Sequence, residues 1–298
     1  MSDGTAVPEK ANDYKKAVRD TYNINAAVYS EHTFMQHRNL EVLAEKIFSA
    51  KDSFACVLDI GAGSGFSLGN LDRYERQDSL GHLVRADISE KALLSGPLIS
   101  RFPYINVCCD AERLPFVENY FDLVYANSVL HWLEAESGHT GFERAIHEAL
   151  RVTKPGGIFA ASIAAAETSR MFFKVYESIM RESGKKLSTK VRIKKNPIGA
   201  MELHTVVDTL LSFGAGIISA ELVYEPVLYS SAKEYLNDVK AYGYHSLLSG
   251  VDANLQSILW NEISQRFLEK VGPGDYLHDQ YMIYVLASIR HNAVDGTR

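Results

Sequence analysis

The chain has 298 residues, a net charge of −6 and a hydrophobic fraction of 46%. This composition is enough to bury the core of one large α/β domain, alone or with a cap, and it excludes wholesale disorder. The acidic balance argues against a general nucleic-acid binder. No apolar run approaches the roughly 18 residues of a membrane span, and the first ten residues lack a signal-peptide core. We therefore expect a soluble cytoplasmic protein with no nucleic-acid or membrane partner.

The three cysteines, Cys56, Cys108 and Cys109, each lie in an apolar, strand-like run. They form neither a CxxC pair nor the Cys and His spacing of a metal site. We expect buried thiols in a reducing compartment, and no metal.

Residues 13–50 have a helical pattern, which we expect to form two pieces. The second piece has an apolar face with spacing i, i+3, i+4, i+7. That face consists of Leu40, Leu43, Ala44 and Ile47. In the first piece, Tyr29 and Gln36 are seven residues apart, so they share one side of a helix. A solvated polar surface is the simpler explanation for that pair.

Five strand-like runs follow, alternating with helix-like stretches. The runs are 54–60, 82–88, 105–111, 121–127 and 157–163, and the clearest helices between them are 90–102 and 142–153. This alternation predicts a mostly parallel sheet that is covered on both faces.

The alternation ends after residue 164. We expect helices over 169–186, 201–213, 233–248 and 254–271, and strands over 217–229 and 281–289. Pro226 indicates an edge or a bend in the first of these strands. The late strands suggest an antiparallel addition at one edge of the sheet.

A glycine-rich turn follows the first strand, with Gly61, Gly63 and Gly65 at alternate positions. Strand, glycine turn and helix together form a corner typical of nucleotide binding. A dinucleotide site needs a small residue where this chain has Phe66. A carboxylate at Asp59 would repel a pyrophosphate but suits a ligand with an ammonium group. S-adenosylmethionine is such a ligand.

Further polar residues stand at the carboxyl ends of the next strands, where ligands bind in open α/β sheets. Asp87 occupies the position at which an acid accepts both ribose hydroxyls. Asp110 can accept from an adenine amino group, and Asn127 ends the fourth strand. Each residue alone is also a plausible cap or turn residue. Together with Asp59 they outline an adenosyl ligand.

Residues 55–163 resemble the class I S-adenosylmethionine-dependent methyltransferases. The matching segments are 59–65, 86–89, 110–116, 121–124, 126–128, 131–132 and 151–157. The resemblance implies an α/β, Rossmann-like sheet of seven strands whose last strand is antiparallel, with S-adenosylmethionine as cofactor. The implied cofactor contacts are Asp59, Gly61, Ala62, Gly63, Asp87, Ile88, Asp110, Ala111, Asn127 and Ser128.

A narrower resemblance links the chain to the malonyl-ACP O-methyltransferases of biotin synthesis, with a related branch of mitochondrial complex I assembly factors. It rests on residues 26–36, 129–132 and 238–247. It implies an N-terminal helical lid over 1–50, a cofactor-binding core over 51–164, and cap helices with C-terminal strands over 165–298. In this lid, Tyr29 and Gln36 would face the methionine end of the cofactor.

Two residues are catalytic candidates. Tyr29 would act from the lid, and His131 suits a general base for a hydroxyl or amine acceptor. A packed histidine beside Trp132 is the alternative for His131. A carboxylate acceptor needs no base, because in-line methyl transfer depends mainly on positioning.

The acceptor contacts are less defined. Tyr242, Tyr244 and His245 are candidates to line the acceptor pocket, with ordinary core or surface positions as the alternative. Arg192 belongs to a basic run over 185–195 that suits a carboxylate or an acidic carrier surface, or is a solvated loop. We expect a methyltransferase acting on a carboxylate of a small or carrier-linked substrate such as malonyl-ACP. The alternatives are a methyltransferase for another small molecule, a cofactor-binding assembly or regulatory protein, and a dinucleotide oxidoreductase.

Overall fold

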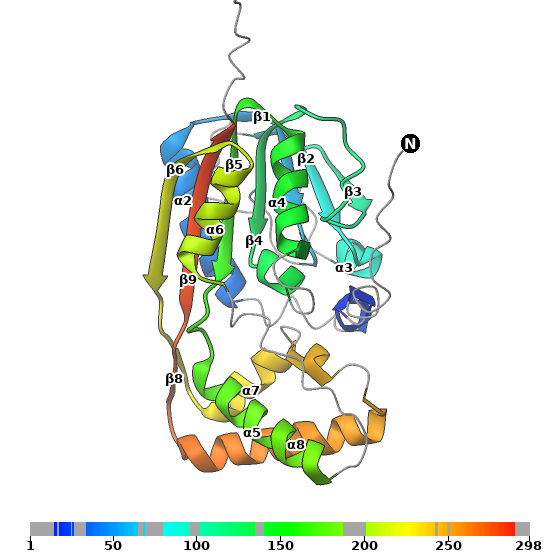
Figure 1. Cartoon of the computed structure of the whole chain (residues 1–298), viewed down its shortest axis with the longest axis vertical. Helices are drawn as coiled ribbons and strands as arrows, with labels where there is room; N and C mark the ends of the chain where they lie inside the picture. The colour runs from blue at the N-terminus through cyan, green and yellow to red at the C-terminus, as the bar shows by residue number, and fades with distance from the viewer. Residues whose placement is uncertain are drawn as a thin grey trace, which may run out of the picture.

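The computed structural model describes most of the chain, in segments that include the whole sheet and most of the cap. These segments are 15–16, 18–24, 26, 34–64, 68, 80–95, 102–134, 140–186, 201–241, 244–248 and 251–289. A twisted sheet with helices on both faces forms the upper part of the molecule in Figure 1, and a helical cap lies below one edge of that sheet.

Seven strands form the sheet in the order β3-β2-β1-β4-β5-β9-β6. They are β1 (Phe54–Ile60), β2 (Leu80–Asp87), β3 (Tyr104–Cys108), β4 (Phe121–Asn127), β5 (Thr153–Ala164), β6 (Ala215–Tyr224) and β9 (Tyr281–Ile289). Strands β1 to β5 pair in parallel, whereas β9 is antiparallel to both β5 and β6. The expected seven-stranded sheet with an antiparallel last strand is confirmed.

Alternating apolar residues fill two cores, one on each face of the sheet. In β4, Leu123 and Tyr125 belong to one core, and Val124 and Ala126 belong to the other. Helix α2 (Phe34–Ala50) covers the first face, and α4 (Thr140–Val152) and α6 (Leu203–Ser212) cover the second. Two buried faces explain why the strands are continuous apolar runs.

Strand β5 begins four residues earlier than the sequence indicates. Thr153 follows α4 directly and pairs with Phe121, and the next pair joins Ile158 to Leu123. Five residues of β5 therefore match two of β4, so the Pro and Gly residues at 155–157 form an irregularity within the ladder. The sequence predicts the strand only from residue 157, because Pro and Gly residues usually end an element.

The cap contains α5 (Arg170–Lys186), α7 (Ala232–Ala241), α8 (Ala253–Val271), the short helix η5 (Tyr244–Leu248), and a two-stranded sheet of β7 (Val227–Tyr229) and β8 (Tyr276–His278). Its core is continuous with the one under α2. The strand expected over 217–229 is split into β6 and β7, with Pro226 between them. The helix expected over 233–248 is likewise split into α7 and η5.

The remaining elements are short. Helix α3 (Glu90–Ser95) covers the first part of the expected 90–102 helix, and η4 (Leu130–Glu134) follows β4. The expectation of three buried thiols is wrong, because Cys108 is exposed on the outer strand β3 while Cys56 and Cys109 are half-buried. Over the segments given above, no helix is long and apolar enough to cross a bilayer.

Candidate functional site

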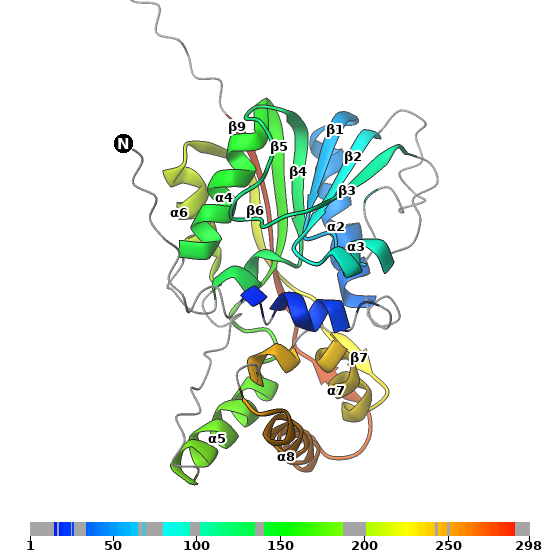
Figure 2. The same ribbon diagram turned by 90° about the vertical axis from the view of Figure 1, so that its right-hand side faces the viewer.

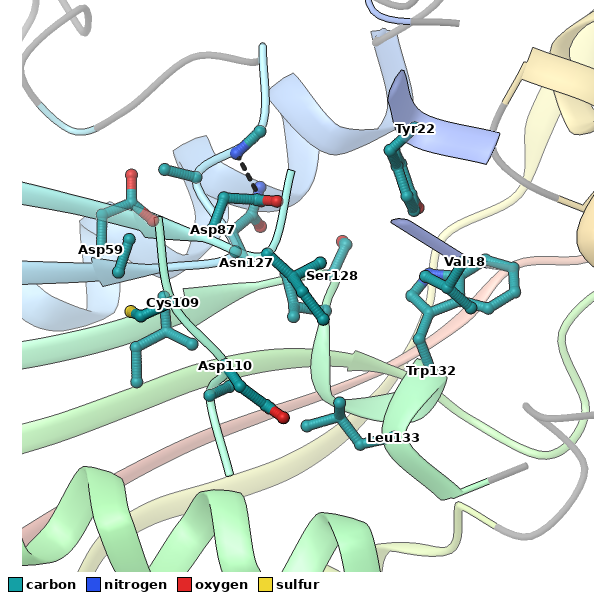
Figure 3. Close-up of a pocket in the computed structure, with 18 of the residues that line it drawn as sticks. Val18, Tyr22, Asp59, Asp87, Cys109, Asp110, Asn127, Ser128, Trp132 and Leu133 are labelled. Atoms are coloured by element: carbon teal, nitrogen blue, oxygen red, sulfur yellow. Dashed lines mark hydrogen bonds between the residues drawn. The ribbon is translucent and has the colours of Figure 1, made fainter. Parts of the chain in front are cut away.

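A pocket opens at the carboxyl ends of the parallel strands, between the sheet and the N-terminal helical segment (Figure 3). Except for Tyr29, which lies outside the described residues, every residue expected to contact the cofactor lines it. These residues are Gln36, Asp59, Gly61, Ala62, Gly63, Asp87, Ile88, Asp110, Ala111, Asn127 and Ser128. The topology therefore brings together residues that lie up to 92 positions apart (from Gln36 to Ser128). Their individual roles remain predictions.

The glycine turn packs tightly against the strand ends. The Gly61 and Ala62 backbone N–H groups both donate to the carbonyl of Ala86, at 2.7 and 3.1 Å. Gly61 has a φ of 71°, and the Val129 side chain fills the place where a Cβ would stand. Only glycine meets both conditions, so this turn leaves bare backbone beside the pocket.

Asp87 fixes the next part of the turn. Its Oδ2 accepts from the Gly63 N–H at 2.9 Å, and its Oδ1 accepts from the Ser89 N–H at 2.7 Å. Burial raises the pKa of this carboxyl, and these two hydrogen bonds oppose that rise. A carboxylate offers about four acceptor sites, so Asp87 can still accept from a ribose while it supports the turn.

A row of polar side chains crosses the sheet beneath the glycine turn. Tyr125, Asp59, Arg85 and Asn106 are register partners on four adjacent strands. The Tyr125 hydroxyl donates to Asp59 Oδ2 at 2.6 Å, and Arg85 Nη2 donates to the Gly63 carbonyl at 2.9 Å. Asp59 is only 3% exposed, and Arg85 only 1%. The row therefore supports the turn from below and limits how Asp59 can meet a ligand.

The N-terminal helical segment, residues 15–24 in the described parts, forms the opposite wall. Figure 2 shows it in dark blue, across the lower ends of the strands and above the cap. Val18 and Tyr22 line the pocket from this segment. Ser89 donates a 2.7 Å hydrogen bond to Asn23, and Lys15 forms an ion pair with Asp110 at 2.6 Å. The helical pattern predicted a helix here, but it gave no indication of these contacts.

Asn127 and Ser128 close the end of the pocket near α2. Asn127 donates to the Gln36 carbonyl at 2.9 Å and accepts from the Ser162 hydroxyl at 2.7 Å. Ser128 has a φ of 59°, in the left-handed region that a non-glycine residue rarely occupies. Hydrogen bonds from its N–H to the carbonyl and hydroxyl of Ser162 hold it there.

A second, smaller pocket, which we call the inner chamber, adjoins the first. The two share Tyr22, Gln36, Ser128 and Trp132. The other residues lining the chamber are Met35, Asn39, His131, Ala164, Thr168, Tyr244, His278, Gln280 and Met282. None of these described residues is an Asp, Glu, Lys or Arg. Burial lowers the pKa of both His131 and His278 to about 3, so both are neutral at pH 7.

Buried Asn39 of α2 connects the residue after β4 with the residue before β9 across this chamber. Its Nδ2 donates to the Ser128 hydroxyl at 3.0 Å, and its Oδ1 accepts from Gln280 Nε2 at 2.8 Å. Asn39 was not among the predicted site residues, because a single polar residue within a helix is usually solvent-exposed. Its position could have indicated its burial, because Asn39 lies between Met35 and Leu40 on the apolar side of the helix.

His131 lies in the inner chamber and not in the first pocket. Its Nδ1 accepts from the Ala164 backbone N–H at 3.3 Å. The neutral ring then carries its proton on Nε2, so His131 is a hydrogen-bond donor. With its pKa near 3, this histidine is a poor general base. The geometry favours the packed histidine beside Trp132, whose ring centroid is 5.4 Å away.

Only one of the predicted acceptor residues can be placed by its side chain. Tyr244 is 5% exposed, lines the inner chamber and forms a 2.8 Å hydrogen bond with Ser169. Tyr242 and Arg192 lie outside the described residues. His245 lies in η5, but its side chain is not described.

Comparison with known proteins gives the same class of domain. Residues 58–161 match the model of a methyltransferase domain family. The chain is 24% identical over 247 residues to the malonyl-ACP O-methyltransferase of Methylovorus sp., covering 81% of this chain and 77% of that one. It is 32% identical over 126 residues to the mitochondrial arginine-hydroxylase NDUFAF5 of Mus musculus, covering 42% of this chain and 34% of that protein. The chain therefore spans only about a third of this second relative.

A solved structure titled loganic acid methyltransferase with SAH has the same fold. It aligns with a TM-score of 0.56 at 12% identity and covers 99% of each chain. The strand order, the pocket at the strand ends and the family match agree. Residues 58–161 thus match a methyltransferase domain within a sheet of the class I S-adenosylmethionine-dependent methyltransferase type, and the chain resembles the malonyl-ACP O-methyltransferases.

Proposed function

We propose that this chain transfers a methyl group from S-adenosylmethionine to a carboxylate oxygen of a small or carrier-linked acid, such as the malonyl group of malonyl-ACP. The observation that carries this proposal is the character of the inner chamber. It adjoins the cofactor pocket, and its described lining holds neither an ionised side chain nor a histidine with a pKa suited to a base.

When bound, S-adenosylmethionine supplies an electrophilic methyl group on a positively charged sulfur. A carboxylate in the chamber is already an anion, so no residue has to remove a proton from it. Its charge disappears when the ester forms, and a surrounding of low polarity favours a reaction that removes charge. The chamber's neutral lining suits such a reaction, provided that it holds the acceptor in line with the methyl group.

The chain's own residues would then position the acceptor and exclude water. His131 presents an N–H donor, and the Tyr244 hydroxyl is held by Ser169. Asn39 fixes Ser128 at the boundary between the two pockets. These groups orient a carboxylate without protonating it, because neutral donors of this kind do not give up their protons near pH 7.

The two groups of relatives suggest different acceptors. An arginine side chain is cationic, and its recognition normally uses a carboxylate. The described lining of the inner chamber offers none. The match to the malonyl-ACP methyltransferase also extends over more of both chains than the match to the arginine hydroxylase. The first observation counts against a guanidinium acceptor, and the second favours an acidic acceptor and methyl transfer over a role in assembly alone.

The test is transfer of label from methyl-labelled S-adenosylmethionine to malonyl-ACP and to a panel of small carboxylic acids. We expect a methyl ester, which mild alkali hydrolyses with release of labelled methanol. The rate should be constant between pH 6 and 9, since no group on the protein has to act as a base. Label that resists alkali would show a methyl ether or an N- or C-methyl product instead of an ester and contradict the proposal. Cofactor binding without transfer to any acid would favour the assembly protein.

A further inference from the structure

Lys15 and Asp110 meet at the edge of the cofactor pocket, although they are 95 residues apart in the chain. The Lys15 ammonium lies 2.6 Å from Asp110 Oδ2 and 2.8 Å from Glu112 Oε1. All three residues line the pocket. The Lys15 side chain is 17% exposed and that of Glu112 is 5% exposed, so this is a partly buried cluster rather than a solvated pair.

The contacts fix the orientation of the Asp110 carboxylate on both sides. Its Oδ1 accepts from the Glu112 backbone N–H at 2.9 Å, and Lys15 holds its Oδ2. Glu112 is itself held by Arg144, whose Nε donates to Oε2 at 2.8 Å. Two acids and two cations therefore balance in charge, and each Asp110 oxygen keeps one acceptor site for a ligand.

We propose that Lys15 is a positioning residue of the cofactor site. It holds the Asp110 carboxylate in the orientation that accepts the amino group of the adenine, and it fastens the N-terminal segment over the bound adenosyl group. This inference rests on the use of an adenosyl cofactor that we propose above, and it assigns a role to a segment that the cofactor motifs do not include.

The physical reason is the freedom of an aspartate side chain. Without Lys15, the Asp110 carboxylate keeps only one of its two hydrogen bonds and can turn towards solvent, since its side chain is 35% exposed. An acceptor that is not held in place loses part of its contribution to binding, because ordering it then costs conformational entropy. The effect should therefore depend on the ligand's amino group.

The experiment compares two ligands on four forms of the full chain, the unmodified chain, two variants of Lys15 and one of Lys16. The ligands are S-adenosylhomocysteine and its analogue with a hydrogen in place of the adenine amino group, and calorimetry gives both affinities. The variants are Lys15→Met, the charge-keeping Lys15→Arg and the matched control Lys16→Met. Lys16 is the neighbouring lysine, exposed on the same segment and not part of the pocket lining.

In the unmodified chain and in Lys16→Met, we expect the analogue to bind about tenfold more weakly, the worth of one hydrogen bond to a charged group. In Lys15→Met the ratio of the two affinities, S-adenosylhomocysteine to analogue, should fall towards one. Lys15→Arg, which keeps a cation, should restore part of it. An equal loss for both ligands in Lys15→Met would overturn the positioning role and leave only a fastening contact, and no change would overturn both. Failure of the unmodified chain to bind S-adenosylhomocysteine would instead count against the proposed function.

Discussion

The two adjoining pockets differ in charge although they share four residues. The cofactor pocket contains the carboxylates of Asp59, Asp87 and Asp110, with Lys15 beside the last of them. The inner chamber contains only neutral groups among its described residues, including two buried histidines. Fixed charges suit a site that must hold a polar ligand in one orientation. A neutral site suits a reaction in which the acceptor loses its charge.

The pockets also differ in how the chain builds them. The acids of the cofactor pocket stand at the ends of neighbouring parallel strands, so the sheet alone brings them together. The chamber takes its residues from α2, η4, η5, the end of β5 and the β8–β9 segment. The acids of the first pocket therefore follow from the sheet itself, whereas the lining of the chamber depends on how the cap and α2 meet the sheet.

The largest expected effect is the loss of ligand affinity when a carboxylate is removed from the cofactor pocket. Asp87→Ala removes the predicted acceptor for the ribose and also frees the Gly63 N–H. Charge-assisted hydrogen bonds contribute about 1.5–3 kcal/mol each, so we expect affinity for S-adenosylhomocysteine to fall about 100-fold. Isothermal titration calorimetry measures it directly.

Asp122→Ala is the matched control for that change. Asp122 lies at the opposite edge of the sheet, near the start of β4, and it accepts from Lys154 Nζ and the Cys56 N–H, both at 2.9 Å. Its loss should lower the stability of the fold and leave the affinity for the cofactor product unchanged. If the two variants lose affinity equally, the strand-end position of Asp87 is not what binds the ligand.

The next largest effect concerns the two buried histidines of the inner chamber and the pH dependence of the protein's stability. Their folded pKa values, about 3, lie below the ordinary 6.5, so the unfolded chain takes up protons first as the pH falls. The stability that they contribute is complete above pH 6.5 and is lost progressively from there towards pH 3. Between pH 7 and 5 we expect each histidine to lower the free energy of unfolding by about 2 kcal/mol. Urea unfolding across this range measures the slope.

Non-titrating replacements separate the contribution of each ring. His131→Asn keeps an acceptor for the Ala164 N–H, and His278→Phe keeps a ring against Tyr235. Each should reduce the pH slope relative to the unmodified chain. An unaltered slope in both buried variants would mean that the chamber is not held neutral by burial.

The cofactor side could be predicted because its residues follow one rule. Once the strands are recognised, their carboxyl ends meet at one edge, and Asp87 and Asn127 follow from that. Arg85 could not be assigned this way. A single arginine in an apolar strand gives no sign that it crosses under the turn to hold the Gly63 carbonyl. Lys15 is a similar case, because an ion pair across 95 residues leaves no local pattern.

The chamber could be predicted only in part. Tyr244 was chosen for its place in the late helical segment, where it departs from the small residue usual in the related families, and it does line the chamber. His278 and Gln280 were not chosen, because β8 is a three-residue strand without periodicity. The sequence also could not show which nitrogen of His131 carries the proton. That depends on the backbone N–H of Ala164, 33 residues away, which donates to Nδ1. Tertiary contacts rather than local patterns decide the chemistry of this half of the site.

The smallest change tests whether the two pockets act independently. Tyr244→Phe keeps the ring that packs against Trp132 and Phe172 but removes the hydroxyl that is bonded to Ser169. We expect a loss of about 1 kcal/mol in stability, the usual worth of one neutral hydrogen bond. The KM for the acceptor should rise a few-fold, with affinity for S-adenosylhomocysteine unchanged.

Tyr176→Phe removes another buried hydroxyl of the cap, one outside the chamber lining, and should cost similar stability without the change in KM. If Tyr244→Phe weakens binding of the cofactor product as much as it raises the acceptor KM, the two pockets form one coupled site, and the division between a charged holding site and a neutral reaction site is wrong.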